Sequence, residues 1–218
     1  MWFVFFIGIL SFVICLIMTP LVIKFSNKFG FVDIPKDSRR VHTKPMPRIG
    51  GLSMVISMYI TIFVYYMLTK NIEGIALDTK LIGFVLGSLI IALMGFIDDA
   101  ITLKARYKAI FQLVAAIVLY VFEIRISGIK IPFLHTDIIN FGILDFPVTL
   151  IWVIGVTNAL NLIDGLDGLS AGIAAISAVA LLIIFVATSV SLEAIIITAI
   201  LVGITLGFLP YNFNPAKT

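Results

Sequence analysis

Long apolar runs separated by short polar segments dominate the sequence. Seven stretches lack Asp, Glu, Lys and Arg: residues 1–23, 49–69, 81–97, 109–122, 146–163, 168–192 and 194–216. One α-helix needs about 20 apolar residues to cross the hydrocarbon core of a bilayer. The fourth run is short, and we expect Glu123 and Arg125 to extend it by snorkelling. The pattern predicts an all-α polytopic membrane protein with about seven transmembrane helices, in a single integral membrane domain over residues 1–218.

Composition excludes the other broad classes of protein. Of the 218 residues, 61% are hydrophobic and 12% are charged, whereas soluble domains carry about 25% charged residues. With a mean hydropathy of +1.18, the sequence has no amphipathic helices to cover a soluble core. The isoelectric point near 9.0 does not indicate a nucleic-acid partner, because the basic residues cluster in loops. The one cysteine, Cys15, cannot form an intrachain disulfide.

The distribution of charge predicts how the chain crosses the membrane. No basic residue precedes Lys24, so the first run lacks the basic start of a signal peptide and is interpreted as an uncleaved helix. Cytoplasmic loops carry an excess of lysine and arginine. Most of these residues fall in 24–48, 98–108 and 217–218, which places these segments in the cytoplasm and the N-terminus outside. The outer segment 126–147, broken by Gly, Pro and Asn, is expected to form a small hairpin.

Two Asp and two Asn fall within ten residues between the fifth and sixth runs. Carboxylates at membrane depth or at its edge are costly, so they are functional candidates. On a helical path Asn161, Asp164 and Asp167 follow at i, i+3 and i+6 and lie on roughly one face. Gly165 and Gly168 would let the backbone leave that path and approach a ligand. This group of oxygens suits a hard cation together with phosphate oxygens.

A second acidic pair, Asp98-Asp99, ends the third run. Two adjacent carboxylates repel, so they favour a divalent cation or a raised pKa in one member. One acid could contact the metal while its neighbour serves as general base. The alternative is a solvated helix end neutralised by Lys104 and Arg106. Because both acidic segments are expected on the cytoplasmic side, they could line one site.

The loop before the second run carries a concentrated basic surface. Arg39, Arg40, Lys44 and Arg48 form this surface, and the loop also contains His42. Guanidinium and ammonium groups suit phosphate, and Gly50-Gly51 permits a tight start to the second span. The alternative is an ordinary cytoplasmic loop that attracts anionic lipid. For His42 a base, a structural residue and a nucleotide contact are all open alternatives.

Three motifs together closely resemble the polyprenyl-phosphate N-acetylhexosamine-1-phosphate transferases of glycosyltransferase family 4. They are Arg-Val-His-Thr-Lys-Pro-Met-Pro-Arg-Ile-Gly-Gly (40–51), Gly-Phe-Ile-Asp-Asp (95–99) and Asn-Ala-Leu-Asn-Leu-Ile-Asp-Gly-Leu-Asp-Gly-Leu-Ser-Ala-Gly (158–172). Their order and approximate spacing also match, so the resemblance covers essentially the whole chain. The first motif is more similar to the branch that transfers GlcNAc-1-phosphate, because the phospho-MurNAc-pentapeptide branch usually carries Thr-Pro-Thr-Met-Gly-Gly there.

The resemblance implies an enzyme, a phospho-N-acetylhexosamine transferase. The phosphate of a membrane polyprenyl phosphate attacks the β-phosphorus of a UDP-sugar, UMP leaves, and a polyprenyl-diphosphate sugar forms. This product initiates synthesis of a cell-envelope polysaccharide or teichoic acid. The implied cofactor is Mg²⁺, with Mn²⁺ as the alternative. The implied setting is the plasma (inner) membrane, with a cytoplasmic active face, no nucleic-acid partner and a homodimer.

The resemblance also assigns the catalytic and phosphate-binding roles. Asp98 is the expected base for the lipid phosphate, and Asp99 is expected to contact the metal or to hold Asp98. Lys108 and Arg48 are expected to hold phosphates, and His42 completes the basic part of the substrate-binding set.

The nucleotide and metal roles fall to the other motif. Asn161, Asp164 and Asp167 are expected to bind the nucleotide diphosphate and its metal ion. The metal ligands implied by the resemblance are therefore Asp99, Asp164 and Asp167.

The end of the sequence departs from the family pattern. Family members have about ten spans and carry a Phe-Met-Gly-Asp-x-Gly-Ser segment and a later His-rich loop, neither of which precedes Thr218. The chain is therefore interpreted as C-terminally truncated, and we expect these 218 residues alone to be an inactive fragment. Two other functions are open. One is a cation- or proton-coupled membrane transporter, since intramembrane acids also mark ion paths; the other is a non-catalytic lipid-binding or assembly protein.

Overall fold

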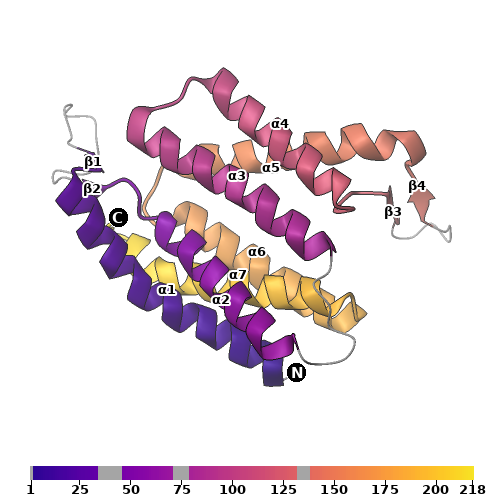
Figure 1. The fold of residues 1–218 in the computed structure, drawn as a ribbon, viewed down its shortest axis with the longest axis horizontal. Helices are drawn as coiled ribbons and strands as arrows, with labels where there is room; N and C mark the ends of the chain where they lie inside the picture. Colours follow the sequence, from indigo (N-terminus) through magenta and orange to yellow (C-terminus); the bar gives the residue numbers. More distant parts are fainter. Residues whose placement is uncertain (1, 34–45, 71–78, 132–137) are drawn as a thin grey trace. The chain divides into compact units, whose positions relative to one another are not determined.

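The computed structural model describes residues 2–33, 46–70, 79–131 and 138–218, and this part of the chain forms seven long α-helices (Figure 1). The helices are α1 (Trp2–Phe29), α2 (Leu52–Thr69), α3 (Thr79–Ile101), α4 (Ala105–Val121), α5 (Asp145–Ile163), α6 (Leu169–Thr188) and α7 (Leu192–Asn212). The shorter elements are the strands β1 (Val32–Asp33), β2 (Met46–Pro47), β3 (Gly128–Ile129) and β4 (Ile139–Asn140), and the 3₁₀ turn η1 (Gly142–Leu144).

The helices correspond to the seven apolar runs, and the prediction of an all-α polytopic membrane protein is confirmed. Six helical segments of the described ranges are long and apolar enough to cross a membrane. Helix α4, with 17 residues, is the short one, as expected for the fourth run. Large apolar side chains stand outward on these helices: Trp2, Ile151 and Ile176 are 90%, 71% and 73% exposed. Apolar surfaces of this kind suit contact with lipid.

The chain divides into two compact units, each of which has its own helix packing. Unit 1 comprises Met1–Ile75 and Ile163–Thr218, and unit 2 comprises Ala76–Leu162. In unit 1, α1 runs along α7, and α2 and α6 also pack against α7 (Figure 1). In unit 2, α3 and α4 form an antiparallel pair. The expectation of a single domain over residues 1–218 stays a prediction.

Small residues let α1 and α7 approach each other closely in unit 1. Ser11 on α1 donates a hydrogen bond to the carbonyl of Ile200 on α7, at 3.2 Å. A Cβ added at Gly203 would overlap Ser11 Oγ and Gly8 O. In lipid, helices associate through close backbone packing and interhelical hydrogen bonds rather than through the hydrophobic effect. Residue size therefore sets the α1–α7 contact as much as apolar character does.

Two short antiparallel hairpins join helices. Strand β1 pairs with β2, and the backbone N–H of Arg48 donates to the carbonyl of Phe31 at 3.0 Å. Gly51 is the N-cap of α2, so the expected tight start of the second span is confirmed. Strand β3 pairs with β4. This second pair confirms the hairpin predicted within residues 126–147.

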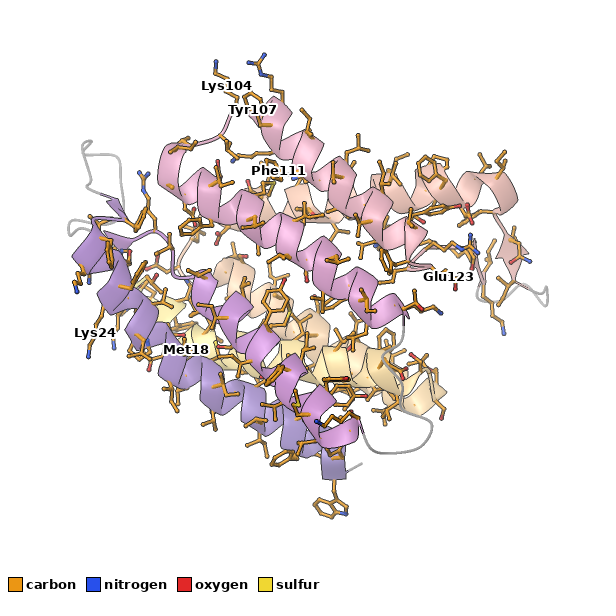
Figure 2. All side chains as sticks on the ribbon, viewed as in Figure 1. Met18, Lys24, Lys104, Tyr107, Phe111 and Glu123 are labelled. Atoms are coloured by element: carbon orange, nitrogen blue, oxygen red, sulfur yellow. The ribbon has the colours of Figure 1, made fainter. Side chains whose placement is uncertain are left out.

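Polar contacts tie α4 to α5 at one end of unit 2. Tyr120 OH donates to Asp145 Oδ1 at 2.8 Å, and Arg125 lies 3.5 Å from the other oxygen of this carboxylate. Figure 2 shows Glu123 at this end of α4 and Lys104 at the opposite end. The opposite end of α4, where Lys104 lies, is close to the acidic pair Asp98-Asp99.

Candidate functional site

The last turn of α3 holds the carboxylate of Asp98 in a fixed setting. Asp98 Oδ2 lies 2.6 Å from Lys108 Nζ, and the backbone N–H of Leu103 donates to Asp98 Oδ1 at 2.8 Å. Thr102 has a positive φ of 52°, which turns the chain sharply after α3. Asp99 lies half-buried in the same turn. The side chains of Lys108 and Asp98 are 25% and 21% exposed, so water screens this ion pair only in part.

The partner of Asp98 is Lys108 rather than the two cations of the alternative interpretation. Arg106 donates to Tyr107 OH at 3.2 Å, and its guanidinium lies over the Tyr107 ring at 4.9 Å. Lys104 is the exposed N-cap residue of α4 (Figure 2). Lys108, which the resemblance assigns to a phosphate, therefore stands directly at the acidic pair.

A pair of side-chain amides connects α4 to α5 further along unit 2. Gln112 Nε2 donates to Asn158 Oδ1 at 3.3 Å, and Asn158 Nδ2 donates back to Gln112 Oε1 at 2.9 Å. Gln112 is 2% exposed. Sequence reasoning missed Gln112, because a single amide does not interrupt an uncharged run. The feature that could have identified Gln112 in the sequence is its position one helical turn after Lys108.

In unit 1, the residues that follow Ile163 line a small polar cavity of about 210 Å³. Its carboxylate and amide side chains come from Asp164, Asp167 and Asn212. Ala216 N donates to Asp167 Oδ2 at 3.1 Å. The remaining lining residues are Met46, Gly165, Leu166, Ala216 and Thr218. The cavity thus combines the acidic turn with β2 and the segment after α7.

Asp164 and Asp167 do not continue the helix face of Asn161, so this prediction is wrong. Helix α5 ends at Ile163, and turns follow it as far as α6. Gly168 has a φ of +73°, a left-handed conformation that glycine adopts at no steric cost. The physical reason for the error is that α5 ends one residue before Asp164, so both acids lie in the turn that leads to α6. The expectation that glycine would take the backbone off the helical path is confirmed for Gly168.

Asp164 is the electrostatically perturbed acid of this turn. Partial desolvation raises the pKa of Asp164 above the usual value of an aspartate, although the residue is still open to solvent. A nearby cation has the opposite effect, because it favours the charged form. Asp164 is therefore a carboxyl group whose ionisation would respond to a bound metal.

The donor set of the cavity fits a hard cation that brings other ligands with it. Among the described residues, no three His, Cys, Asp or Glu side chains gather closely enough to hold a metal ion. Asp164 and Asp167 supply carboxylate oxygens, and Asn212 supplies an amide. Mg²⁺ usually takes one or two carboxylates and fills its shell with water and phosphate oxygens. The residues therefore fit Mg²⁺ in the presence of a phosphorylated ligand.

The other predicted site residues lie in different parts of the chain. Arg48 is exposed after β2 in unit 1, and Asn161 is exposed on the last turn of α5 in unit 2. The predicted metal set, which joins Asp99 to the two aspartates of the turn, draws on both units and stays a prediction. His42 lies outside the described residues, as do Arg39, Arg40 and Lys44.

Asn212 is a second site residue that sequence reasoning missed. The run 194–216 predicted one uninterrupted span, whereas α7 ends at Asn212. Asn212 Nδ2 donates to the carbonyl of Thr218 at 3.0 Å, which folds the last residues toward the cavity. The signal was a polar residue shortly before Pro215, because proline ends a helix.

Comparison with known proteins identifies relatives of one kind of enzyme. The protein of Bacillus subtilis (strain 168) named "Probable undecaprenyl-phosphate N-acetylglucosaminyl 1-phosphate transferase" is 36% identical over 96% of this chain and 55% of its own length. The phospho-N-acetylmuramoyl-pentapeptide-transferase of Halalkalibacterium halodurans is 34% identical over 96% of this chain and 66% of its own length. The decaprenyl-phosphate N-acetylglucosaminephosphotransferase of Mycolicibacterium smegmatis is 32% identical over 97% and 54%.

These matches extend along nearly the whole chain, which spans between about half and two thirds of the length of these curated relatives. The sequence profile described as glycosyl transferase family 4 matches residues 81–218. The matched region includes the Asp98–Lys108 pair and the acidic turn around Asp164. The family resemblance of the three motifs is therefore confirmed, and the chain belongs to glycosyl transferase family 4.

Proposed function

We propose that the full-length protein transfers a sugar 1-phosphate, GlcNAc-1-phosphate in the first instance, from a UDP-sugar to a membrane polyprenyl phosphate. The observation that carries the proposal is the Asp98–Lys108 pair, a partly buried acid and cation at the end of an apolar helix in a chain of this family. The names of the relatives include undecaprenyl-phosphate and decaprenyl-phosphate transferases, which supports a polyprenyl phosphate as acceptor.

In the proposed reaction an oxygen of the lipid phosphate forms a bond to the β-phosphorus of the UDP-sugar. The bond from that phosphorus to the bridging oxygen breaks, and UMP leaves with this oxygen. Lys108 receives the incoming lipid phosphate, because an ammonium group is a strong partner for phosphate oxygens. Asp98, released from Lys108, accepts the remaining proton of the lipid phosphate, and its bond from Leu103 N keeps it in place.

The acidic turn of unit 1 is the proposed place of the nucleotide diphosphate. Asp164 and Asp167 would hold Mg²⁺ there, and Asn212 would offer an amide to the diphosphate. When bound, the ion neutralises charge that gathers on the phosphoryl oxygens during transfer. The cavity is small and lined by polar groups, so the diphosphate is its proposed occupant.

The position of the acids argues against the transporter. Every Asp and Glu in the described ranges lies in the first or last turn of a helix or outside the helices. A proton or cation path through the bilayer would place acids near the middle of a helix. Acids at helix ends suit a reaction at the membrane surface.

We further propose that the N-terminus lies outside and that the Asp98 end of α3 faces the cytoplasm of a plasma-membrane protein. Cys15, the one native cysteine, is fully buried. In the protein with Lys104→Cys, a membrane-impermeant thiol reagent applied to spheroplasts should therefore give no label. With Glu123→Cys, at the other end of α4, it should label the protein. The reverse pattern would show the opposite orientation.

The test of the activity is transfer of radiolabel from UDP-GlcNAc to a polyprenyl phosphate by the full-length protein in membranes with Mg²⁺. Wild-type protein should form the labelled lipid, and Asp98→Asn should form far less of it at a pH below the second pKa of the lipid phosphate. Unlabelled UDP-MurNAc-pentapeptide is the competitor that separates the two sugar branches found among the relatives. Size-exclusion chromatography with light scattering tests the homodimer. Absence of any labelled lipid from either sugar donor would refute the proposed function.

A further inference from the structure

The amide pair of Gln112 and Asn158 has no role in the proposed chemistry, yet it joins a buried side chain of α4 to an exposed one of α5 by two reciprocal hydrogen bonds. Both amides donate and accept, at 3.3 Å and 2.9 Å, and Asn158 Nδ2 also donates to Ile154 O at 2.9 Å. Gln112 is the buried member of the pair, and its amide would be costly in an apolar setting without a partner. Two reciprocal bonds fix both the distance between two helices and their rotation, which one bond does not.

The pair stands between two groups of candidate site residues. Gln112 lies four residues after Lys108 on α4, and Asn158 lies three residues before Asn161 on α5. Residues at these spacings are neighbours on one helix face. Through Lys108 and Asp98, the same part of α4 is also tied to α3. The contact of α4 with α5 therefore bears on where both Lys108 and Asn161 stand.

We propose that Gln112 and Asn158 are positioning residues, which lock the rotation of α4 against α5 so that Lys108 and Asn161 meet the two substrates in register. The inference rests on the proposed transferase function. A small displacement of a reacting group lowers the rate of a reaction more than it weakens binding, because transfer needs a near-attack geometry. The pair should consequently affect kcat more than KM.

The far end of the same helix pair provides a matched control. Tyr120 OH donates to Asp145 Oδ1 at 2.8 Å, and this bond also joins α4 to α5. Tyr120→Phe removes one polar link between the same two helices without touching the lysine or the motif asparagines. If polar links act only by stabilising the fold, Tyr120→Phe and Gln112→Leu should behave alike.

The experiment measures kcat, both KM values and the thermal midpoint for the full-length protein in lipid nanodiscs. Gln112→Leu and Asn158→Leu should each lower kcat at least tenfold, with the KM values changed less than threefold. The double substitution should cost no more than the larger single one, because the two side chains act as one unit. Tyr120→Phe should leave kcat within twofold of wild type.

A swapped pair, Gln112→Asn with Asn158→Gln, keeps both amides and the total side-chain length. On a logarithmic scale, the swapped pair should recover at least a third of the kcat that Gln112→Leu loses. Such a recovery would show that the loss in Gln112→Leu comes from the missing amide bonds and not from misfolding. The inference is overturned if Gln112→Leu lowers only the thermal midpoint, if its loss adds fully to that of Asn158→Leu, or if the swap recovers nothing. Normal transfer by Asp98→Asn would instead refute the proposed base. The kcat values of the Gln112 and Asn158 variants would still decide whether the amide pair positions the two helices.

Discussion

Lys108 Nζ lies 2.6 Å from Asp98 Oδ2, so the lysine and the carboxylate are already joined before any substrate is present. The other oxygen of Asp98 accepts the backbone N–H of Leu103 at 2.8 Å. An incoming phosphate must compete with Asp98 for the ammonium group of Lys108, since the two side chains are already paired. Entry of the lipid phosphate would in this way free the carboxylate at the moment when a proton acceptor is needed.

Asp98→Asn should lower kcat by about 10²- to 10⁴-fold, the usual contribution of a general base. The deficit should depend on pH. A phosphate monoester loses its second proton with a pKa of about 6, so above that pH the acceptor needs little help from a base. Radiolabel transfer measured across this range should therefore show the largest deficit at acidic pH. An equal deficit at every pH would mean that Asp98 acts by holding Lys108 instead.

The same substitution at Asp145 is the control for Asp98→Asn. Asp145 is paired with Arg125 at 3.5 Å and accepts a bond from Tyr120, at the end of unit 2 away from Lys104. Asp145→Asn should lower the thermal midpoint of the protein and leave kcat near the wild-type value. A comparable loss of kcat would show that any charge change in unit 2 is damaging.

Lys108→Met should lower kcat/KM for the polyprenyl phosphate by about 10- to 100-fold, the loss of one charge-assisted hydrogen bond. Lys108→Arg keeps the charge and should retain more activity than Lys108→Met. Lys104→Met is the matched control, because it removes the same charge from an exposed position one turn earlier. If both methionine variants lose activity equally, the effect is the net charge of the membrane surface and not a contact of Lys108.

The helices and the three motifs could be predicted from sequence, because both depend on residues that lie close together along the chain. Apolar runs, the short fourth one included, predicted the seven helices of the described residues, and the acids stood out against them. The prediction that Asn161 and Asp164 share one helix face was wrong. Residue spacing alone does not tell where a helix ends, and α5 ends at Ile163. Gln112 escaped notice for a different reason. Its importance depends on Asn158, 46 residues away, and such a pairing has no local signature.

Asp164→Asn should weaken Mg²⁺ binding at the acidic turn and reduce its pH dependence. The ion binds the deprotonated carboxylate, so binding weakens as the pH falls through the pKa of Asp164. Because desolvation raises that pKa, the weakening should begin at a higher pH than for an ordinary aspartate. Mg²⁺ titrations of UDP-sugar binding to the full-length protein at several pH values test this. A wild-type profile with no pH dependence would contradict it.

The raised pKa of Asp164 also predicts a change in stability of known sign. A carboxyl whose pKa is higher in the folded state lowers the stability as the pH rises above its unfolded pKa of about 3.9. The loss is complete once the pH exceeds the folded pKa. Without Mg²⁺, Asp164→Asn should therefore raise the thermal midpoint at neutral pH, and the difference should vanish near pH 4. A lower midpoint at neutral pH would contradict this sign.

Gly168→Ala should cost about 1–3 kcal/mol of stability, because alanine is strained at the φ of +73° found there. The new Cβ would also stand 3.2 Å from the ring of Phe213. Gly172→Ala is the control: it lies on α6, where an added Cβ meets nothing within 4 Å. In unfolding experiments the second variant should be neutral or stabilised. If Gly168→Ala matches it, the turn that carries Asp164 and Asp167 is less constrained than the structure indicates.

Gly203→Ala should separate α1 from α7, because its Cβ would overlap both Ser11 Oγ and the backbone carbonyl of Gly8. A serine side chain can rotate away, but a helix backbone cannot, so the helices must move apart. Overpacking of this kind costs about 1–3 kcal/mol. Gly155→Ala on α5 is the matched control, since its Cβ would have no neighbour within 4 Å. The Ser11–Ile200 hydrogen bond offers a further check: Gly203→Ala combined with Ser11→Ala should be no more stable than Gly203→Ala alone, because the carbonyl of Gly8 still blocks the approach. Recovery of the thermal midpoint in that double variant would show that the side chain, and not the backbone, limits the distance between these helices.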